Sequence, residues 1–149
     1  GVADTIDGRY DMVALHAFLV LRRLKRDRAA TARLAQSIFD VFFADMDQNL
    51  RAIGVGDLSV GRTVKGMAKL FYGRISAYDK GLVAGERVLA DALARNLYRG
   101  ADVEKHALEA MVGYVRREAD ALEQQPVDRL LGGEVIFGRP PMAGEDESP

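Results

Sequence analysis

The chain has 149 residues, no cysteine and a formal net charge of −1 at pH 7. Its length and its hydrophobic content of 48% are typical of a single folded domain, neither disordered nor divided into several domains. The missing cysteine excludes disulfides, thiolate metal sites and cysteine nucleophiles, and the small net charge argues against nucleic acid as a partner.

The two halves of the chain differ in charge. Residues 1–85 hold 13 Lys and Arg against 9 Asp and Glu, whereas residues 86–149 hold 8 against 13. This asymmetry indicates one surface that favours anions. The longest apolar run, residues 12–21, contains a histidine and is about half as long as a membrane-spanning helix, which favours a soluble domain.

Apolar residues at helical spacing predict the first two helices. The first covers about residues 10–25, with Asp7 and Asp11 as candidate N-caps and four cations near its end. The second covers about residues 29–53 and ends before Gly54, a residue type common at helix C-termini. Its apolar stripe consists of Leu34, Ile38, Phe42, Met46, Leu50 and Ile53.

A third helical stripe follows a short loop in which Asp57 and Ser59 are candidate N-caps. Gly61, Gly66 and Gly73 lie within it, and each costs about 1 kcal/mol relative to alanine. They indicate either the close approach of a neighbouring backbone or a break into two shorter helices. The stripe consists of Val60, Val64, Met67, Phe71, Ile75, Tyr78 and Leu82.

The second half of the sequence predicts two more helices. They cover about residues 85–98 and 103–124, with Asp102 as the cap of the latter and Pro126 as its stop. Residues 130–137 suit a short helix and then an extended segment. The predicted fold is therefore an all-α, single-domain helical bundle of about five main helices over residues 1–138, followed by a disordered tail, 139–149.

Two segments imitate ligand-binding motifs. Residues 56–63 approach a phosphate-binding P-loop, but a helix precedes them instead of a strand, and arginine replaces the lysine. Residues 45–49 imitate the start of a calcium-binding EF-hand loop, but Leu50 and Gly56 stand where glycine and glutamate are required. We therefore predict neither a nucleotide nor a metal.

The histidines and serines show no catalytic pattern. His16 lies in an apolar helix, which favours a core residue with one satisfied hydrogen bond. His106 follows Asp102 at an exposed helix start, and Ser59 and Ser76 have no histidine nearby. We predict no catalytic residue, no cofactor and no enzymatic activity.

Residues 22–28 hold five cations and one acid, Asp27. One interpretation is a solvated helix end whose cations interact with the helix dipole. The other is a contact with phosphate, with an anionic membrane surface or with an acidic partner. A peripheral membrane-surface module that uses this segment is the alternative function.

Residues 65–78 combine methionine, phenylalanine and two tyrosines with three cations on one predicted helix. Phe71 and Tyr72 are adjacent, so they cannot both face the core squarely. The segment is either an aromatic core edged by long cationic side chains or an exposed patch of residues that are enriched in protein interfaces. We expect this helix to present its charges and aromatic rings outward and to bind a partner.

Several blocks of the sequence resemble the ubiquinol–cytochrome c chaperone family. The first block is DMVALH at 11–16 with LRRL at 21–24, and the second is FADMDQNLR at 43–51 with GVGDLSVG at 54–61. The third runs from Lys65 through FYGR at 71–74 to Tyr78. The blocks follow the family's order and spacing over about residues 8–82, and the second half is similar more loosely.

The resemblance implies a non-catalytic chaperone that binds newly made cytochrome b, with a small assembly partner protein, for the assembly of ubiquinol–cytochrome c reductase (complex III). It also implies a bacterial member in the cytoplasm, at the inner face of the inner membrane, with further helices upstream of residue 1. The partner-binding residues that it implies are His16, Arg22, Arg23, Asp45, Asp47, Asn49, Arg51, Asp57, Lys65, Phe71, Tyr72, Arg74 and Tyr78.

Overall fold

The computed structural model describes residues 2–141, and the regular structure within them is entirely helical. The predicted all-α fold is confirmed, with five longer helices and a sixth of 5 residues. Of the tail predicted to be disordered, residues 142–149 lie outside the described range. The helices are α1 (Ile6–Arg26), α2 (Arg28–Ala52), α3 (Asp57–Ala84), α4 (Glu86–Asn96), α5 (Lys105–Gln124) and α6 (Val127–Leu131).

The helices start at other residues than the capping patterns predicted. Thr5 is the N-cap of α1, because its hydroxyl accepts a backbone N–H of the first turn at 3.0 Å. The predicted caps Asp7 and Asp11 lie inside that helix. Asp57 is the first residue of α3, and Asp102 lies ahead of α5, so neither is a cap.

α3 is one continuous helix of 28 residues. A Cβ atom at Gly61, Gly66 or Gly73 would meet nothing within 4 Å, so these glycines neither break the helix nor admit a neighbouring backbone. Gly81 does admit one, since a Cβ there would lie 2.7 Å from the Cα of Leu89. This contact lets α4 fold back closely onto the end of α3.

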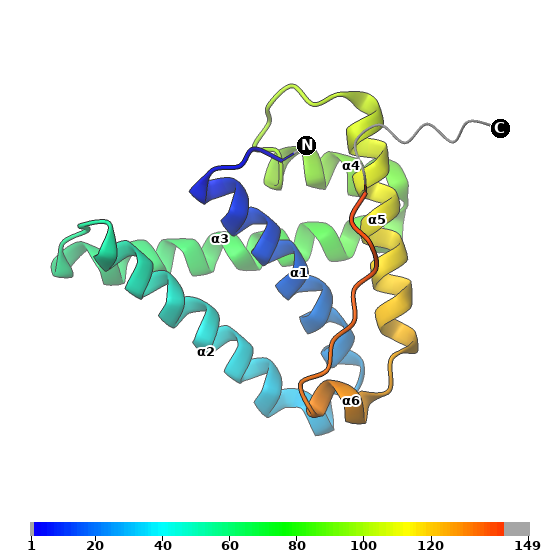
Figure 1. Cartoon of the computed structure of the whole chain (residues 1–149), viewed down its shortest axis with the longest axis horizontal. Helices are drawn as coiled ribbons and strands as arrows, with labels where there is room; N and C mark the ends of the chain where they lie inside the picture. The colour runs from blue at the N-terminus through cyan, green and yellow to red at the C-terminus, as the bar shows by residue number, and fades with distance from the viewer. Residues whose placement is uncertain (1, 142–149) are drawn as a thin grey trace.

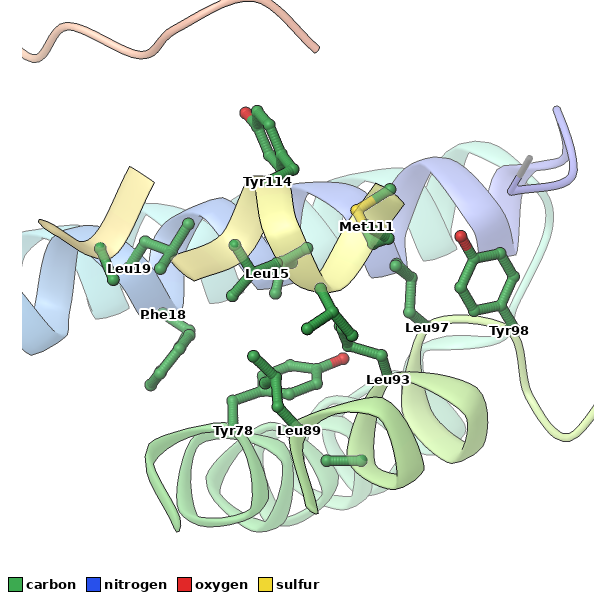
Figure 2. Packing of buried hydrophobic residues seen from close by; sticks show 14 of the residues in the cluster. Leu15, Phe18, Leu19, Tyr78, Leu89, Leu93, Leu97, Tyr98, Met111 and Tyr114 are labelled. Carbon is green, nitrogen blue, oxygen red and sulfur yellow. The ribbon is translucent and has the colours of Figure 1, made fainter. Parts of the chain in front are cut away.

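The main core lies where α1, α3, α4 and α5 meet (Figure 2). Its rings include Phe18 of α1 and Tyr78 of α3, whose centroids are 5.4 Å apart. Burial of this apolar surface is the principal favourable term in folding. The core includes Leu15, Phe18, Leu19, Tyr78, Leu89, Leu93, Leu97, Met111, Val112, Tyr114, Val115 and Leu122.

A second, aromatic cluster joins α2 to α1 and α3. Phe71 of α3 lies at its centre, with ring centroids 5.1 Å from Phe42, 5.6 Å from Phe39 and 5.8 Å from Phe43 of α2. The expectation that α3 presents its aromatic rings outward is therefore wrong for Phe71 and Tyr78, which are buried. The apolar stripe of α3 faces the interior, and the aromatic rings that lie on this stripe are buried with it.

The hydroxyl of Tyr78 is buried and has no hydrogen-bond partner among the described residues. Because Tyr78→Phe removes an unsatisfied polar group, it should raise the free energy of unfolding at pH 7 by about 1 kcal/mol in urea denaturation. Tyr72→Phe is the matched control on the same helix. Its ring is exposed, and the change should be less than about 0.5 kcal/mol.

The same substitution should alter the alkaline limb of the stability curve. Burial raises the pKa of Tyr78 above its ordinary value of 10.0. The unfolded chain therefore loses this proton at a lower pH than the folded chain does. Titration of Tyr78 should leave the free energy of unfolding unchanged below pH 10 and lower it as the pH rises above 10. Tyr78→Phe should make that fall shallower. An unchanged slope in the variant would contradict this account of Tyr78.

Candidate partner-binding grooves

α2 is the least buried of the long helices. Only Thr31 and Phe42 among its 25 residues are buried. Figure 1 shows α2 running along one side of the molecule, between the one-residue link to α1 and the start of α3. Its aromatic contacts are made near its middle, where Phe42 packs on Phe71 of α3. Its predicted apolar stripe is therefore only partly covered, and the half-buried members are Leu34, Ile38, Met46 and Leu50.

An apolar groove lies between α1 and α2, and we call it the α1–α2 groove. Its volume is about 810 Å³. Val41 of α2 is 69% exposed on its wall, so this apolar surface is open to solvent. The lining includes Met12, Val13 and Val20 from α1 and Leu34, Ile38 and Val41 from α2, with Val135 and Phe137 from the segment after α6.

His16 belongs to the floor of this groove. Its Nδ1 lies 2.8 Å from the carbonyl oxygen of Met12, and its Nε2 lies 2.8 Å from the hydroxyl oxygen of Tyr114. Because a carbonyl only accepts, Nδ1 donates to Met12, and the Tyr114 hydroxyl is the hydrogen-bond partner of Nε2. The prediction of a core residue with one hydrogen bond is wrong on both points, since His16 is half-buried on the groove and has two hydrogen-bond partners.

A second groove lies between α1, α2 and α3, and we call it the cation-rimmed groove. It has a volume of about 440 Å³ and an apolar interior that includes Phe39 and Tyr72. These two rings stack, with centroids 5.5 Å apart and an interplanar angle of 22°. Lys25 and Arg28 are exposed at its rim, so the groove joins an aromatic wall to positive charge.

The basic segment 22–28 is largely paired within the molecule. Arg22 binds Asp79 at 3.2 Å and Glu123 at 3.0 Å, and Arg26 binds Glu123 at 2.8 Å. Arg23 is buried. Among the described residues, only Lys25 and Arg28 of the five cations form no ion pair, which leaves little charge for the alternative membrane-surface function.

A buried carboxylate ties the N-terminal half of α1 to α3 and to the loop after α4. Asp11 is fully buried, and it accepts hydrogen bonds from Arg74 and, at 2.6 Å, from the Nε of Arg99. The guanidinium of Arg74 also lies over the Tyr10 ring, 5.5 Å from its centroid. Asp11 lies on the same helix face as Leu15. An acidic residue on an apolar helix face is the sequence signal that could have indicated a buried ion pair at Asp11.

The predicted residues at the α2–α3 hairpin form an exposed polar cluster. Asn49 donates to Asp45 of its own helix at 3.0 Å, so this hydrogen bond does not connect two helices. Arg51 binds Asp47 at 2.7 Å and also contacts Asp57. Exposed pairs of this kind add little stability, so these residues are free to meet a partner.

The thirteen residues implied by the resemblance do not form one surface. His16 and Asp45 lie on the α1–α2 groove, and Arg22 and Tyr72 lie on the cation-rimmed groove. The exposed Lys65 lies outside both linings, and so do the other hairpin residues, namely Asp47, Asn49, Arg51 and Asp57. The remaining four are mostly or fully covered. These four are Arg23, Phe71, Arg74 and Tyr78.

No group of three or more His, Asp or Glu within residues 2–141 could hold a metal ion. The residues that sequence analysis missed are the apolar walls of the grooves, above all Val13, Val20 and Val41. They lie on helices whose apolar stripes were assigned to a closed core. The sequence signal was the width of those apolar stripes. When a stripe is too wide for one neighbouring helix to cover, some of its apolar side chains stay exposed.

The ubiquinol–cytochrome c chaperone family profile matches residues 1–137 of this chain. The ubiquinol-cytochrome-c reductase complex assembly factor 1 of Xenopus laevis is 30% identical over 135 residues, which are 90% of this chain and 68% of that protein. The human protein of the same name is 29% identical over 135 residues, 90% of this chain and 45% of its own length. The chain therefore spans less than half of the human relative.

A solved structure shares this arrangement of helices. The crystal structure of the Cbp3 homolog from Brucella abortus superposes with a TM-score of 0.82 at 39% sequence identity. The similarity covers 93% of this chain and 76% of that one. Sequence and structure therefore agree on one relationship over nearly all of the chain.

Removing the Asp11 carboxylate should strongly destabilise the fold. Asp11→Ala leaves the mostly buried Arg74 without its counter-ion, so the free energy of unfolding should fall by about 3 kcal/mol. Asp4→Ala is the control, because it breaks the exposed pair with Arg9 and should cost less than about 1 kcal/mol. Equal losses for the two variants in urea denaturation would contradict this assignment.

Proposed function

Because this chain belongs to the ubiquinol–cytochrome c chaperone family, we propose that it assists the assembly of ubiquinol–cytochrome c reductase (complex III) by binding newly made cytochrome b. The chain acts by binding and not by catalysis. The observation that carries this proposal is the incompletely covered α2, whose apolar stripe opens on the α1–α2 groove.

The chemistry of the α1–α2 groove suits an apolar segment of such a client. An amphipathic helix binds by laying its apolar face into a groove lined by aliphatic side chains, and such grooves are formed between helices. Val13, Val20 and Val41 provide this lining, and Asp45 adds a negative charge at its edge. A basic loop that flanks an apolar client segment would meet this carboxylate.

The cation-rimmed groove offers the complementary charge. Lys25 and Arg28 line the same groove as Tyr72, whose ring is 58% exposed. Tyrosine and arginine are enriched in protein interfaces because they combine contact area with hydrogen bonding. This second groove suits an acidic loop of the client or the small assembly partner protein.

We further propose that the chain acts in the bacterial cytoplasm, at the inner face of the inner membrane. The similarity to the Brucella abortus protein supports a bacterial source. Within residues 2–141, no helix is both long enough and apolar enough to cross a membrane.

Site-specific photo-cross-linking in cells tests the client. A photoreactive residue at Val41, on the wall of the α1–α2 groove, should capture cytochrome b while complex III is being assembled. Val83 is the matched position, because it is a 79% exposed valine on α3 that lines neither groove. Equal capture from both positions, or capture of cytochrome b from neither, would refute the proposal.

Val41→Asp should separate binding from stability. An aspartate in the groove must lose its hydration when an apolar segment binds, so recovery of cytochrome b with the tagged chain should fall about tenfold. Val83→Asp should leave recovery unchanged. Both side chains are exposed, so each variant should keep its free energy of unfolding within about 0.5 kcal/mol. The complex III level in cells should follow the recovery.

A further inference from the structure

The chain ends its described part in an extended segment, residues 134–141, which we call the strap. It follows α6 through a turn in which Gly133 has a φ of +86°. Figure 1 shows the strap, in orange to red, running back along α5 without regular structure of its own. Its attachment to α5 therefore depends on individual side chains.

The side chains of α5 and its C-cap bind the main chain of the strap. Gln125 uses both ends of its amide on one residue, donating to the carbonyl oxygen of Ile136 at 2.7 Å and accepting its N–H at 3.1 Å. Arg117 donates to the carbonyl oxygen of Arg139 at 2.7 Å. Polar contacts to a main chain recognise an extended conformation more than a particular sequence.

Glu118 adds the one strict requirement of this site. Its side chain is 1% exposed, and one carboxylate oxygen accepts the N–H of Gly138 at 2.7 Å. A Cβ atom on residue 138 would lie 2.7 Å from the other oxygen, so any residue other than glycine would have to push this buried carboxylate aside. That other oxygen also pairs with the Nε of Arg117 at 3.2 Å, so the buried carboxylate is bound by α5 on one side and by the N–H of the strap on the other.

The side chains of the strap alternate between the groove and solvent. Val135 and Phe137 line the α1–α2 groove, and the Phe137 ring meets the His16 ring edge-on with centroids 4.9 Å apart. Ile136 lies between them and is 59% exposed. The strap therefore presents the pattern apolar–any–aromatic–glycine, with the apolar and aromatic positions facing the groove.

We propose that α5 carries a binding site for extended polypeptide and that the strap is its displaceable intramolecular occupant. The second occupant is a segment of a partner protein with the same apolar–any–aromatic–glycine pattern. When the strap leaves, Val135 and Phe137 leave with it, and the α1–α2 groove becomes continuous with the α5 site. This inference extends the proposed function but does not depend on cytochrome b being the client.

A tethered segment competes at an effective concentration on the order of millimolar, so a partner segment meets strong competition from the strap. Weakening the strap while keeping the α5 site intact removes this competition. Gly138→Ala does so, because it places the new Cβ against Glu118 and changes nothing on α5. Ile136→Pro does so independently, because it removes the N–H that Gln125 accepts.

The test uses the full chain and two synthetic peptides. The first peptide, EVIFGRPP, copies the strap, and the second, EVIFARPP, differs from it only by alanine in place of glycine. We expect the first peptide to bind the Gly138→Ala and Ile136→Pro chains about tenfold more tightly than it binds the wild-type chain in fluorescence anisotropy. The alanine peptide should bind each of the three chains more weakly than the glycine peptide does, because its Cβ displaces the Glu118 carboxylate.

The Ile136→Ala chain is the matched control. It keeps the N–H and changes only an exposed side chain, so it should bind the first peptide as weakly as the wild-type chain does. Equal affinity of all chains for the glycine peptide, or of the alanine and glycine peptides for one chain, would overturn the proposal.

Two further outcomes would also overturn it. If Gly138→Ala and Ile136→Pro both lower the melting temperature of the whole domain, the strap is a fixed part of the fold and not a displaceable occupant. If the wild-type chain dimerises with exchanged straps, the second occupant is another copy of this chain. Failure in either form leaves the cross-linking test from Val41 unaffected, so the two proposals can fail separately.

Discussion

The turn between α1 and α2, which we call the corner, is held by Arg23. It fixes the angle between the two helices, and both grooves depend on that angle. One residue, Asp27, separates the two helices. The buried guanidinium of Arg23 donates to Asp27 at 2.5 Å and to the carbonyl oxygens of Leu122 and Gln125 at 2.9 Å each. The buried hydroxyl of Thr31 closes the corner from α2, donating to a carbonyl of the last turn of α1 at 2.6 Å. A buried charge with this many acceptors has few alternative arrangements, so the corner is rigid.

A rigid corner at one end and an aromatic contact at mid-length hold α2 without covering all of it. Phe42 and its neighbours, near the middle of α2, pack on Phe71, and residues on either side of these rings line the two grooves. In most small domains such a stripe would be covered by another helix of the same chain. Here the larger core is formed by α1, α3, α4 and α5 and contains no residue of α2. The fold can therefore keep apolar surface available to a partner and stay folded.

The helices and their apolar faces could be predicted from the sequence because period and composition determine both locally. What the sequence did not predict depends on contacts between distant residues. Asp11 was taken for a cap, although its partners, Arg74 and Arg99, lie 63 and 88 residues away. Phe71 was expected outside because cations flank it, yet α2 supplies the rings that cover it. The close contact at Gly81 was not predicted, because only the folding back of α4 brings the backbone of Leu89 against it. The grooves themselves are surface that packing leaves uncovered, which no local pattern specifies.

Gln125 connects the corner with the strap. Its carbonyl oxygen accepts from Arg23, while its side-chain amide binds the main chain of Ile136. The residue that follows α5 therefore has its backbone fixed by the α1–α2 corner, and this fixed backbone aims the amide at the strap. Glu118, two turns earlier on α5, faces the same segment, so the two polar groups have a spacing set by the helix. The main chain of the strap therefore binds two polar groups, Gln125 and Glu118, that are held at a fixed spacing. Arg23, which fixes the backbone of Gln125, also fixes the angle between the two helices of the α1–α2 groove.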